Sequence, residues 1–67
     1  MSNYLGFEKD GAGVVTAVVV NERKEVVGRF LLDKDNPLEV KKAELLGIDM
    51  GYACYAYEYK TASENSK

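Results

Sequence analysis

Histidine is absent from this chain of 67 residues, and cysteine occurs once, as Cys54. Without histidine, nucleophilic and acid–base schemes that depend on an imidazole are excluded. One cysteine cannot form a disulfide within the chain, and a structural zinc site needs four nitrogen or sulfur ligands. We therefore predict no metal site and no cofactor, and we interpret Cys54 as a buried structural thiol.

Long apolar runs and a strong charge of one sign are also missing. The longest apolar run, AGVVTAVVV, has about half of the roughly 20 residues that a membrane-spanning helix needs. The N-terminus lacks a basic segment followed by an apolar one, so we expect no signal peptide. The formal net charge is −2, which argues against a nucleic-acid partner because such binding requires dense Lys and Arg patches. A single free thiol suits a reducing compartment, so we predict a cytoplasmic protein without membrane contact.

The chain is long enough for one small domain. A domain of this size buries only about 60% of the surface that its unfolded chain exposes. Since disulfides and metals are excluded, it must rely on good packing or on self-association. We assign residues 1–60 to a single α+β domain and residues 61–67, which are small and polar, to a flexible tail.

Three segments predict the strands of an antiparallel sheet. Residues 3–8 alternate weakly, residues 14–20 are rich in valine, and residues 25–32 form the return strand. The valine-rich segment is apolar on both faces, so we expect at least part of it to be central and covered on both sides. Residues 10–13 predict a turn and residues 21–24 a hairpin loop. Gly28 marks a bulge or a close approach of the helix.

A helix-start signal follows the third strand. Asn36 is a favourable N-cap, Pro37 suits the first helical position, and Glu39 lies three residues after the cap. Together these residues predict a capping box, in which the Glu39 carboxylate would bond to the Asn36 backbone N–H.

Two interpretations of the segment after Gly47 compete. In the first, Gly47 ends the helix and residues 48–59 form a last strand, which gives a β-β-β-α-β order. In the second, the helix continues to about Lys60, which gives three strands and one long C-terminal helix packed on the sheet. At 100° per residue, the second interpretation gathers an uncharged apolar face. This face comprises Ala43, Leu46, Gly47, Met50, Ala53, Cys54 and Tyr57. We favour the long helix for this reason.

The long helix would carry a second apolar stripe away from the first face. The stripe comprises Leu45, Ile48, Tyr52, Tyr55 and Tyr59. A three-stranded sheet covers only one face of a helix, and tyrosine is favoured at interfaces. We predict that these five residues bind a partner protein or a second copy of the chain. The alternative is that the tyrosines wrap the edge of the sheet.

The order of the elements carries a resemblance to a known family. The segment VVVNERKEVVGRF, the connector with Asn36 and the segment KKAELLGIDMGYA together resemble the first half of ribonuclease H-like domains. Asp10-Gly11 and Ala43-Glu44-Leu45 would match the acidic positions of that family. The resemblance implies a β-β-β-α topology and two of the carboxylates used by the family. Two-metal phosphodiester chemistry needs several carboxylates around its ions, so we still predict no enzymatic activity.

These observations favour a small non-catalytic interaction or regulatory module that forms a homodimer or binds a partner protein. The first alternative is a reduced ribonuclease H-like or other nucleic-acid-associated protein. The second alternative is a small inhibitor of a larger enzyme, of the kind that mobile elements encode.

Overall fold

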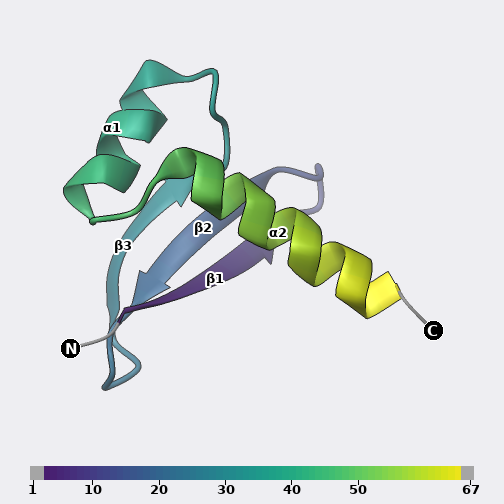
Figure 1. Ribbon diagram of the computed structural model, residues 1–67, viewed down its shortest axis with the longest axis horizontal. Helices are drawn as coiled ribbons and strands as arrows, with labels where there is room; N and C mark the ends of the chain where they lie inside the picture. The colour runs from purple at the N-terminus through teal and green to yellow at the C-terminus, as the bar shows by residue number, and fades with distance from the viewer. Residues whose placement is uncertain (1–2, 66–67) are drawn as a thin grey trace.

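The fold consists of a three-stranded sheet followed by two helices (Figure 1). The computed structural model describes the backbone of residues 3–65 and the side chains of residues 3–62. In chain order, the elements are β1 (Tyr4–Lys9), β2 (Val15–Val20), β3 (Val26–Leu31), α1 (Pro37–Leu45) and α2 (Met50–Asn65). The predicted α+β class and the three strands are confirmed. The alternative last strand at residues 48–59 is not formed, because most of these residues belong to α2.

The strands pair in the order β1-β2-β3, and both pairs are antiparallel. The predicted turn between β1 and β2 is confirmed: the Asp10 carboxylate accepts hydrogen bonds from the backbone N–H groups of Ala12 and Val14, at 2.8 and 2.9 Å. The predicted loop between β2 and β3 is held in the same way. There the Asn21 side-chain oxygen accepts from the N–H groups of Arg23 and Glu25.

Gly28 lies where β3 is irregular and where the connection between the helices comes closest. The β2–β3 register shifts between Val19 and Val20, which is a bulge. A Cβ atom built on Gly28 would lie 2.7 Å from Cδ1 of Leu46 and 3.0 Å from its Cγ. Both expectations for Gly28 are therefore confirmed, since it lies at a bulge and admits the Leu46 side chain against the sheet.

The hydrophobic core lies between one face of the sheet and both helices (Figure 1). Its buried members are Ala17, Val19, Phe30, Ala43, Met50 and Ala53. Val18 is also buried, but it alternates to the other face of β2 and does not belong to this cluster. The strand is central, as predicted. The described helices form a single layer (Figure 1), so no helix covers the second face of the strand, although Val18 on that face is only 6% exposed.

The predicted long helix is interrupted, and this is the main correction to the predicted fold. Gly47 has a φ of +79°, which ends α1 in the left-handed conformation that glycine adopts readily. The N–H of Gly47 donates to the carbonyl of Glu44, and the N–H of Ile48 donates to that of Ala43. This pair of bonds is a Schellman motif. The Asp49 carboxylate then accepts from the N–H of Gly51 at 2.7 Å and starts α2.

The C-terminal segment also differs from expectation, because α2 continues to Asn65. Residues 61–65 of the predicted tail are therefore helical. Ser66 and Lys67, the end of that tail, lie outside the described residues.

The start of α1 confirms one half of the predicted capping box. The Asn36 side chain accepts from the N–H of Leu38 at 3.1 Å, and Pro37 is the first helical residue. The second half is wrong, because the Asn36 N–H donates to the carbonyl of Asp33. The buried Glu39 carboxylate instead accepts from the backbone N–H of Leu31 at 2.6 Å. Its other oxygen pairs with the Lys42 ammonium group at 3.0 Å.

This contact of Glu39 should make stability depend on pH. The hydrogen bond from Leu31, and then the one from Lys42, hold the pKa of Glu39 below its ordinary value of 4.5, although burial opposes them. The folded chain therefore binds a proton at Glu39 less readily than the unfolded chain does. The resulting stabilisation is complete above the unfolded pKa and is lost as pH falls through the lower folded pKa.

We expect Glu39→Gln to lower the free energy of unfolding at neutral pH, with a deficit that shrinks at about pH 3. Urea unfolding of both chains at the two pH values measures this change. Glu44→Gln, on the exposed side of the same helix, is the control and should have little effect at either pH. A deficit that is the same at both pH values would contradict the assigned role of the Glu39 carboxylate.

Candidate protein-interaction surface

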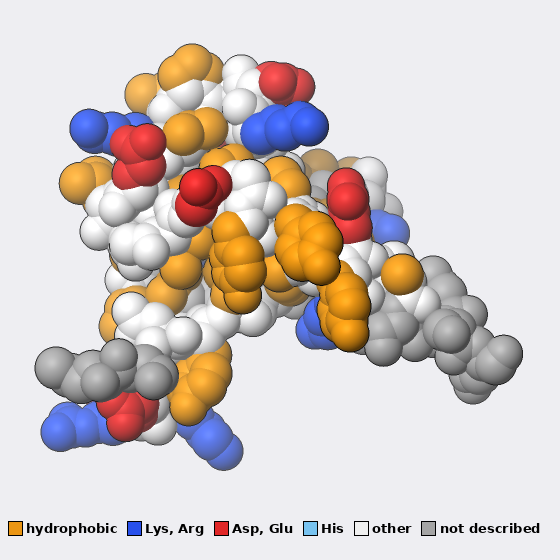
Figure 2. Space-filling model, in the orientation of Figure 1, with side chains coloured by type: hydrophobic (Ala, Val, Ile, Leu, Met, Phe, Trp, Pro, Cys, Tyr) orange, Lys and Arg blue, Asp and Glu red, His pale blue; other side chains and the backbone are white. Residues whose placement is uncertain are grey.

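Three tyrosines on α2 form the most prominent exposed aromatic group of the chain. Tyr52, Tyr55 and Tyr59 are 59%, 63% and 69% exposed, and we call them the tyrosine face. Their spacing of three and four residues places them on one side of the helix. The rings of Tyr55 and Tyr59 lie 6.3 Å apart. Figure 2 shows hydrophobic side chains gathered along α2 on the side that faces the viewer.

The opposite side of α2 packs on the sheet. Met50 and Ala53 are buried in the core. Tyr57 contacts Phe7 of β1 edge to face, with ring centroids 5.2 Å apart. One tyrosine of this helix is thus part of the packing between helix and sheet, whereas the three of the tyrosine face have no such contact with the sheet among the described residues.

The other two residues of the predicted stripe are placed differently. Leu45 is 77% exposed but ends α1, before the chain turns at Gly47. Ile48 is half-buried in the connection and packs against the core. The break in the helix therefore limits the continuous part of the stripe to Tyr52, Tyr55 and Tyr59.

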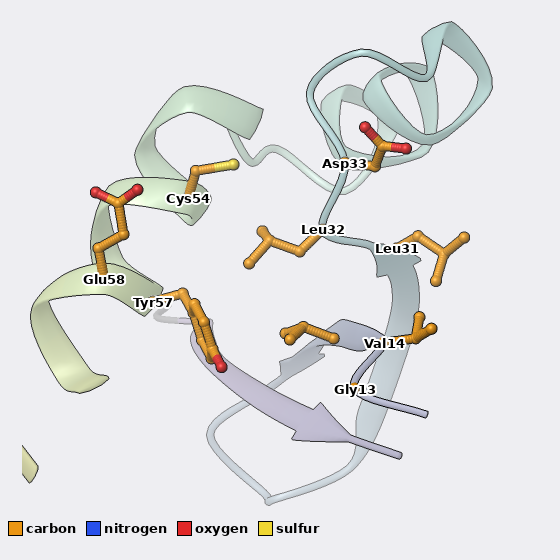
Figure 3. A pocket seen from close by; sticks show the side chains of 9 residues that line it. Gly13, Val14, Leu31, Leu32, Asp33, Cys54, Tyr57 and Glu58 are labelled. Atoms are coloured by element: carbon orange, nitrogen blue, oxygen red, sulfur yellow. The ribbon is translucent and has the colours of Figure 1, made fainter. Parts of the chain in front are cut away.

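Cys54 lines a cavity of about 450 Å³ between α2 and the ends of β2 and β3. In Figure 3, the side chains of Leu32, Cys54 and Tyr57 point toward one another, whereas Leu31 and Val14 point away. The lining residues also include two carboxylates, Asp33 and Glu58, but no basic side chain. Nothing in this lining would activate the thiol as a nucleophile, since activation needs a nearby base or positive charge.

The two carboxylates singled out by the ribonuclease H resemblance lie in different surroundings. The Asp10 carboxylate accepts hydrogen bonds from two backbone N–H groups of the β1–β2 turn. Glu44 lies on α1 and lines a second hollow with Lys34 and Asp49, which Asp10 does not line. Within the described residues, no group of three or more acidic or cysteine side chains is arranged to hold a metal ion.

A second exposed apolar region, which was not predicted from the sequence, lies on the face of the sheet away from the helices. Tyr4 and Val26 are 60% and 50% exposed there. They lie on either side of Val20, which pairs with both. The sequence does carry a signal for this region. Alternation in residues 3–8 places Tyr4 and Phe7 on opposite faces of a strand, so only one of the two can face the helices.

Comparisons with protein-family models, curated proteins and solved structures found no match for this chain. The resemblance to ribonuclease H-like domains therefore stays a prediction. Neither described helix combines the length and apolar character needed to cross a bilayer.

Proposed function

We propose that this chain is a small, non-catalytic interaction module of the cytoplasm that associates with another protein chain through the tyrosine face. The observation that carries the proposal is the exposure of Tyr52, Tyr55 and Tyr59 on a helix whose opposite side is packed on the sheet. Tyrosine combines a large rigid apolar ring with a polar hydroxyl group. It therefore suits a surface that is exposed to solvent in the free chain and buried in a complex.

The size of the tyrosine face supports a transient contact. With 59–69% of each side chain exposed, and a buried area of roughly 150–250 Å² for a whole aromatic side chain, the three offer about 400 Å². A stable interface buries about 800 Å² on each partner. We therefore expect association in the high-micromolar range from this surface alone.

The charges around the tyrosine face favour a protein partner over single-stranded nucleic acid. Base stacking on aromatic rings is normally combined with a basic groove along the phosphate backbone. On α2, Glu58 precedes Tyr59 and Lys60 follows it. These opposite charges cancel and provide no basic groove beside the rings.

A second copy of the chain is the partner to test first. In sedimentation equilibrium at up to about 1 mM, we expect the weight-average mass of Tyr52→Lys/Tyr55→Lys to fall below that of the wild type. The reason is that two charges would then have to be desolvated in the contact. Leu38→Lys is the matched control, because Leu38 is 75% exposed but lies on α1.

The control should sediment as the wild type does, and circular dichroism should show that all three chains fold. Equal masses for the wild type and the double variant would mean that the tyrosine face does not mediate self-association. A wild type that remains monomeric at the highest concentration would also show that the tyrosine face does not mediate self-association.

A further inference from the structure

The two edges of the sheet differ in how many backbone groups they leave open. The N–H of Asp10 donates to Val14 and the N–H of Leu32 donates to Val15, each at 3.0 Å. Because antiparallel ladders alternate, the backbone groups of Leu5, Phe7 and Lys9 point away from β2. On β3, the alternation places those of Arg29 and Leu31 at the outer edge.

The β3 edge is largely closed by the chain itself. The N–H of Leu31 donates to the Glu39 carboxylate, and its carbonyl accepts from the N–H of Asp33 at 2.9 Å. The other end of β3 carries the bulge opposite Val19 and Val20. Bulges and covering elements are the usual means by which proteins prevent an edge strand from pairing.

The β1 edge has neither device. All six residues of β1 pair with β2 in an unbroken register. Among the described residues, no side chain or loop bonds to the outward groups of Leu5 and Phe7. Both side chains are only half-buried. In addition, α2 continues past β1 on the side away from β2 (Figure 1), so an added strand would lie beneath it.

We propose that β1 pairs antiparallel with β1 of a second copy, with the two Gly6 residues opposite each other on a two-fold axis. This register places Leu5 opposite Phe7 of the second copy on the helix side of the sheet. It places Tyr4 opposite Glu8 on the other side. The first pair is apolar, and in the second the Tyr4 hydroxyl can donate to the Glu8 carboxylate. Both kinds of cross-strand pair stabilise neighbouring strands.

Other arrangements of the same two strands are less favourable. Parallel pairing would bring Glu8 near Glu8 and Lys9 near Lys9, and like charges opposite each other are destabilising. An antiparallel register shifted by two residues in one direction would place Leu5 opposite Lys9. A shift in the other direction would pair only Tyr4, Leu5 and Gly6 of each strand. The charges of β1 lie only at its C-terminal end, so the proposed pairing separates them to opposite ends of the interface.

The pairing would create a closed dimer with a continuous six-stranded sheet. All helices would lie on the same side of it, and both tyrosine faces would be presented together. Two linked copies of a weak surface bind a bivalent target more tightly than one copy. This contact goes beyond the proposed function, because it uses a different surface and would exist without the tyrosine face.

Gly6 offers a direct test. A Cβ atom built on Gly6 meets only the Val18 carbonyl oxygen, at 3.8 Å, so a side chain fits in the single chain. In the dimer, the two Gly6 Cα atoms would be about 4.5 Å apart. Gly6→Glu should therefore weaken dimerisation about a hundredfold through like-charge repulsion, and Gly6→Lys should do the same. Gly6→Thr is the uncharged control and should still dimerise.

Sedimentation equilibrium of these chains, separately and as an equimolar mixture of Gly6→Glu and Gly6→Lys, measures the effect. The mixture should recover the dimer, because opposite charges would then face each other. The proposal is wrong if folded Gly6→Glu dimerises like the wild type, if the mixture stays monomeric, or if the wild type does not dimerise. Hydrogen exchange of the unmodified chain gives a second readout that needs no variant: the Leu5 and Phe7 amides should be protected at high concentration only.

Tyr52→Lys/Tyr55→Lys separates this proposal from the proposed function. We expect that variant to retain the β1 dimer and to lose only the further association through the tyrosine face. If it is monomeric while Gly6→Glu associates as the wild type does, the tyrosine face is the contact and the β1 pairing is wrong.

Discussion

Phe30→Ala is expected to unfold a large part of the population at 25 °C. Phe30 is 1% exposed and, with Val19, is one of the two largest fully buried side chains of the described residues. It belongs to the core cluster that joins the sheet to both helices. Truncating a buried phenylalanine costs about 3–5 kcal/mol, because the cavity collapses only in part.

The cost is severe because the chain is small. At roughly 0.05–0.15 kcal/mol per residue, its total stability is about 3–10 kcal/mol. Urea unfolding followed by circular dichroism measures the change. Leu31→Ala is the matched control: the side chain is the next along the same strand, is 37% exposed, and points away from the core. If both variants lose equal stability, the core is not centred where the structure places it.

Gly28→Ala is expected to destabilise the chain by about 1–3 kcal/mol, the cost typical of adding atoms to a filled site. The new methyl group would overlap Cδ1, Cδ2 and Cγ of Leu46. Leu46 would have to leave its place against β3, and it lies at the end of α1 where the chain turns. The substitution is therefore expected to displace the turn between the helices as well as to loosen its packing on the sheet.

A double-mutant cycle isolates this contact. In a Leu46→Ala background the space above Gly28 is free, and alanine is favoured over glycine in a strand interior by about 0.5–1 kcal/mol. Gly28→Ala should then stabilise the chain, so its effect changes sign. Gly11→Ala, where a Cβ meets nothing within 4 Å, is the control for a general effect of removing glycine. An unchanged sign in the Leu46→Ala background would contradict the close approach.

Much of the fold follows from local patterns in the sequence. The valine-rich segment predicts β2 because β-branched side chains suit a pleated surface. Asn36 and Pro37 predict the start of α1 through a cap that depends only on adjacent residues. Ala43, Met50 and Ala53 of the predicted apolar face are buried in the core, whereas Gly47, at the break between the helices, is exposed.

The end of the first helix at Gly47 belonged to the interpretation that we did not favour, although its local signals are present in the sequence. Both helices bury one side in the same core, so helical periodicity continues through the connection and does not distinguish one helix from two. The deciding signals were the left-handed Gly47 and the Asp49 side chain, which caps α2. Periodicity outweighed these signals in the prediction, and this error extended the predicted interface to Leu45 and Ile48.

The role of Glu39 could not be predicted from neighbouring residues. A capping box satisfies a local N–H group, but the Leu31 N–H at the β3 edge is the group that Glu39 binds. That group lacks a partner only because β3 is an edge strand, which is a property of the assembled sheet. The outward backbone groups of β1 are unpaired for the same reason, because β1 is the other edge strand of the sheet.

The most direct test of the tyrosine face is a dilution series followed by the ring resonances of the tyrosines on α2. The account predicts that the resonances of Tyr52, Tyr55 and Tyr59 shift as concentration rises toward about 1 mM. The series is recorded on Gly6→Glu, in which pairing through β1 is weakened. In that variant Tyr57 is the internal control, because its ring packs against Phe7 of β1 on the opposite side of the helix, and it should not shift. Shifts of Tyr57 alone, or of none of the four rings, would contradict the account.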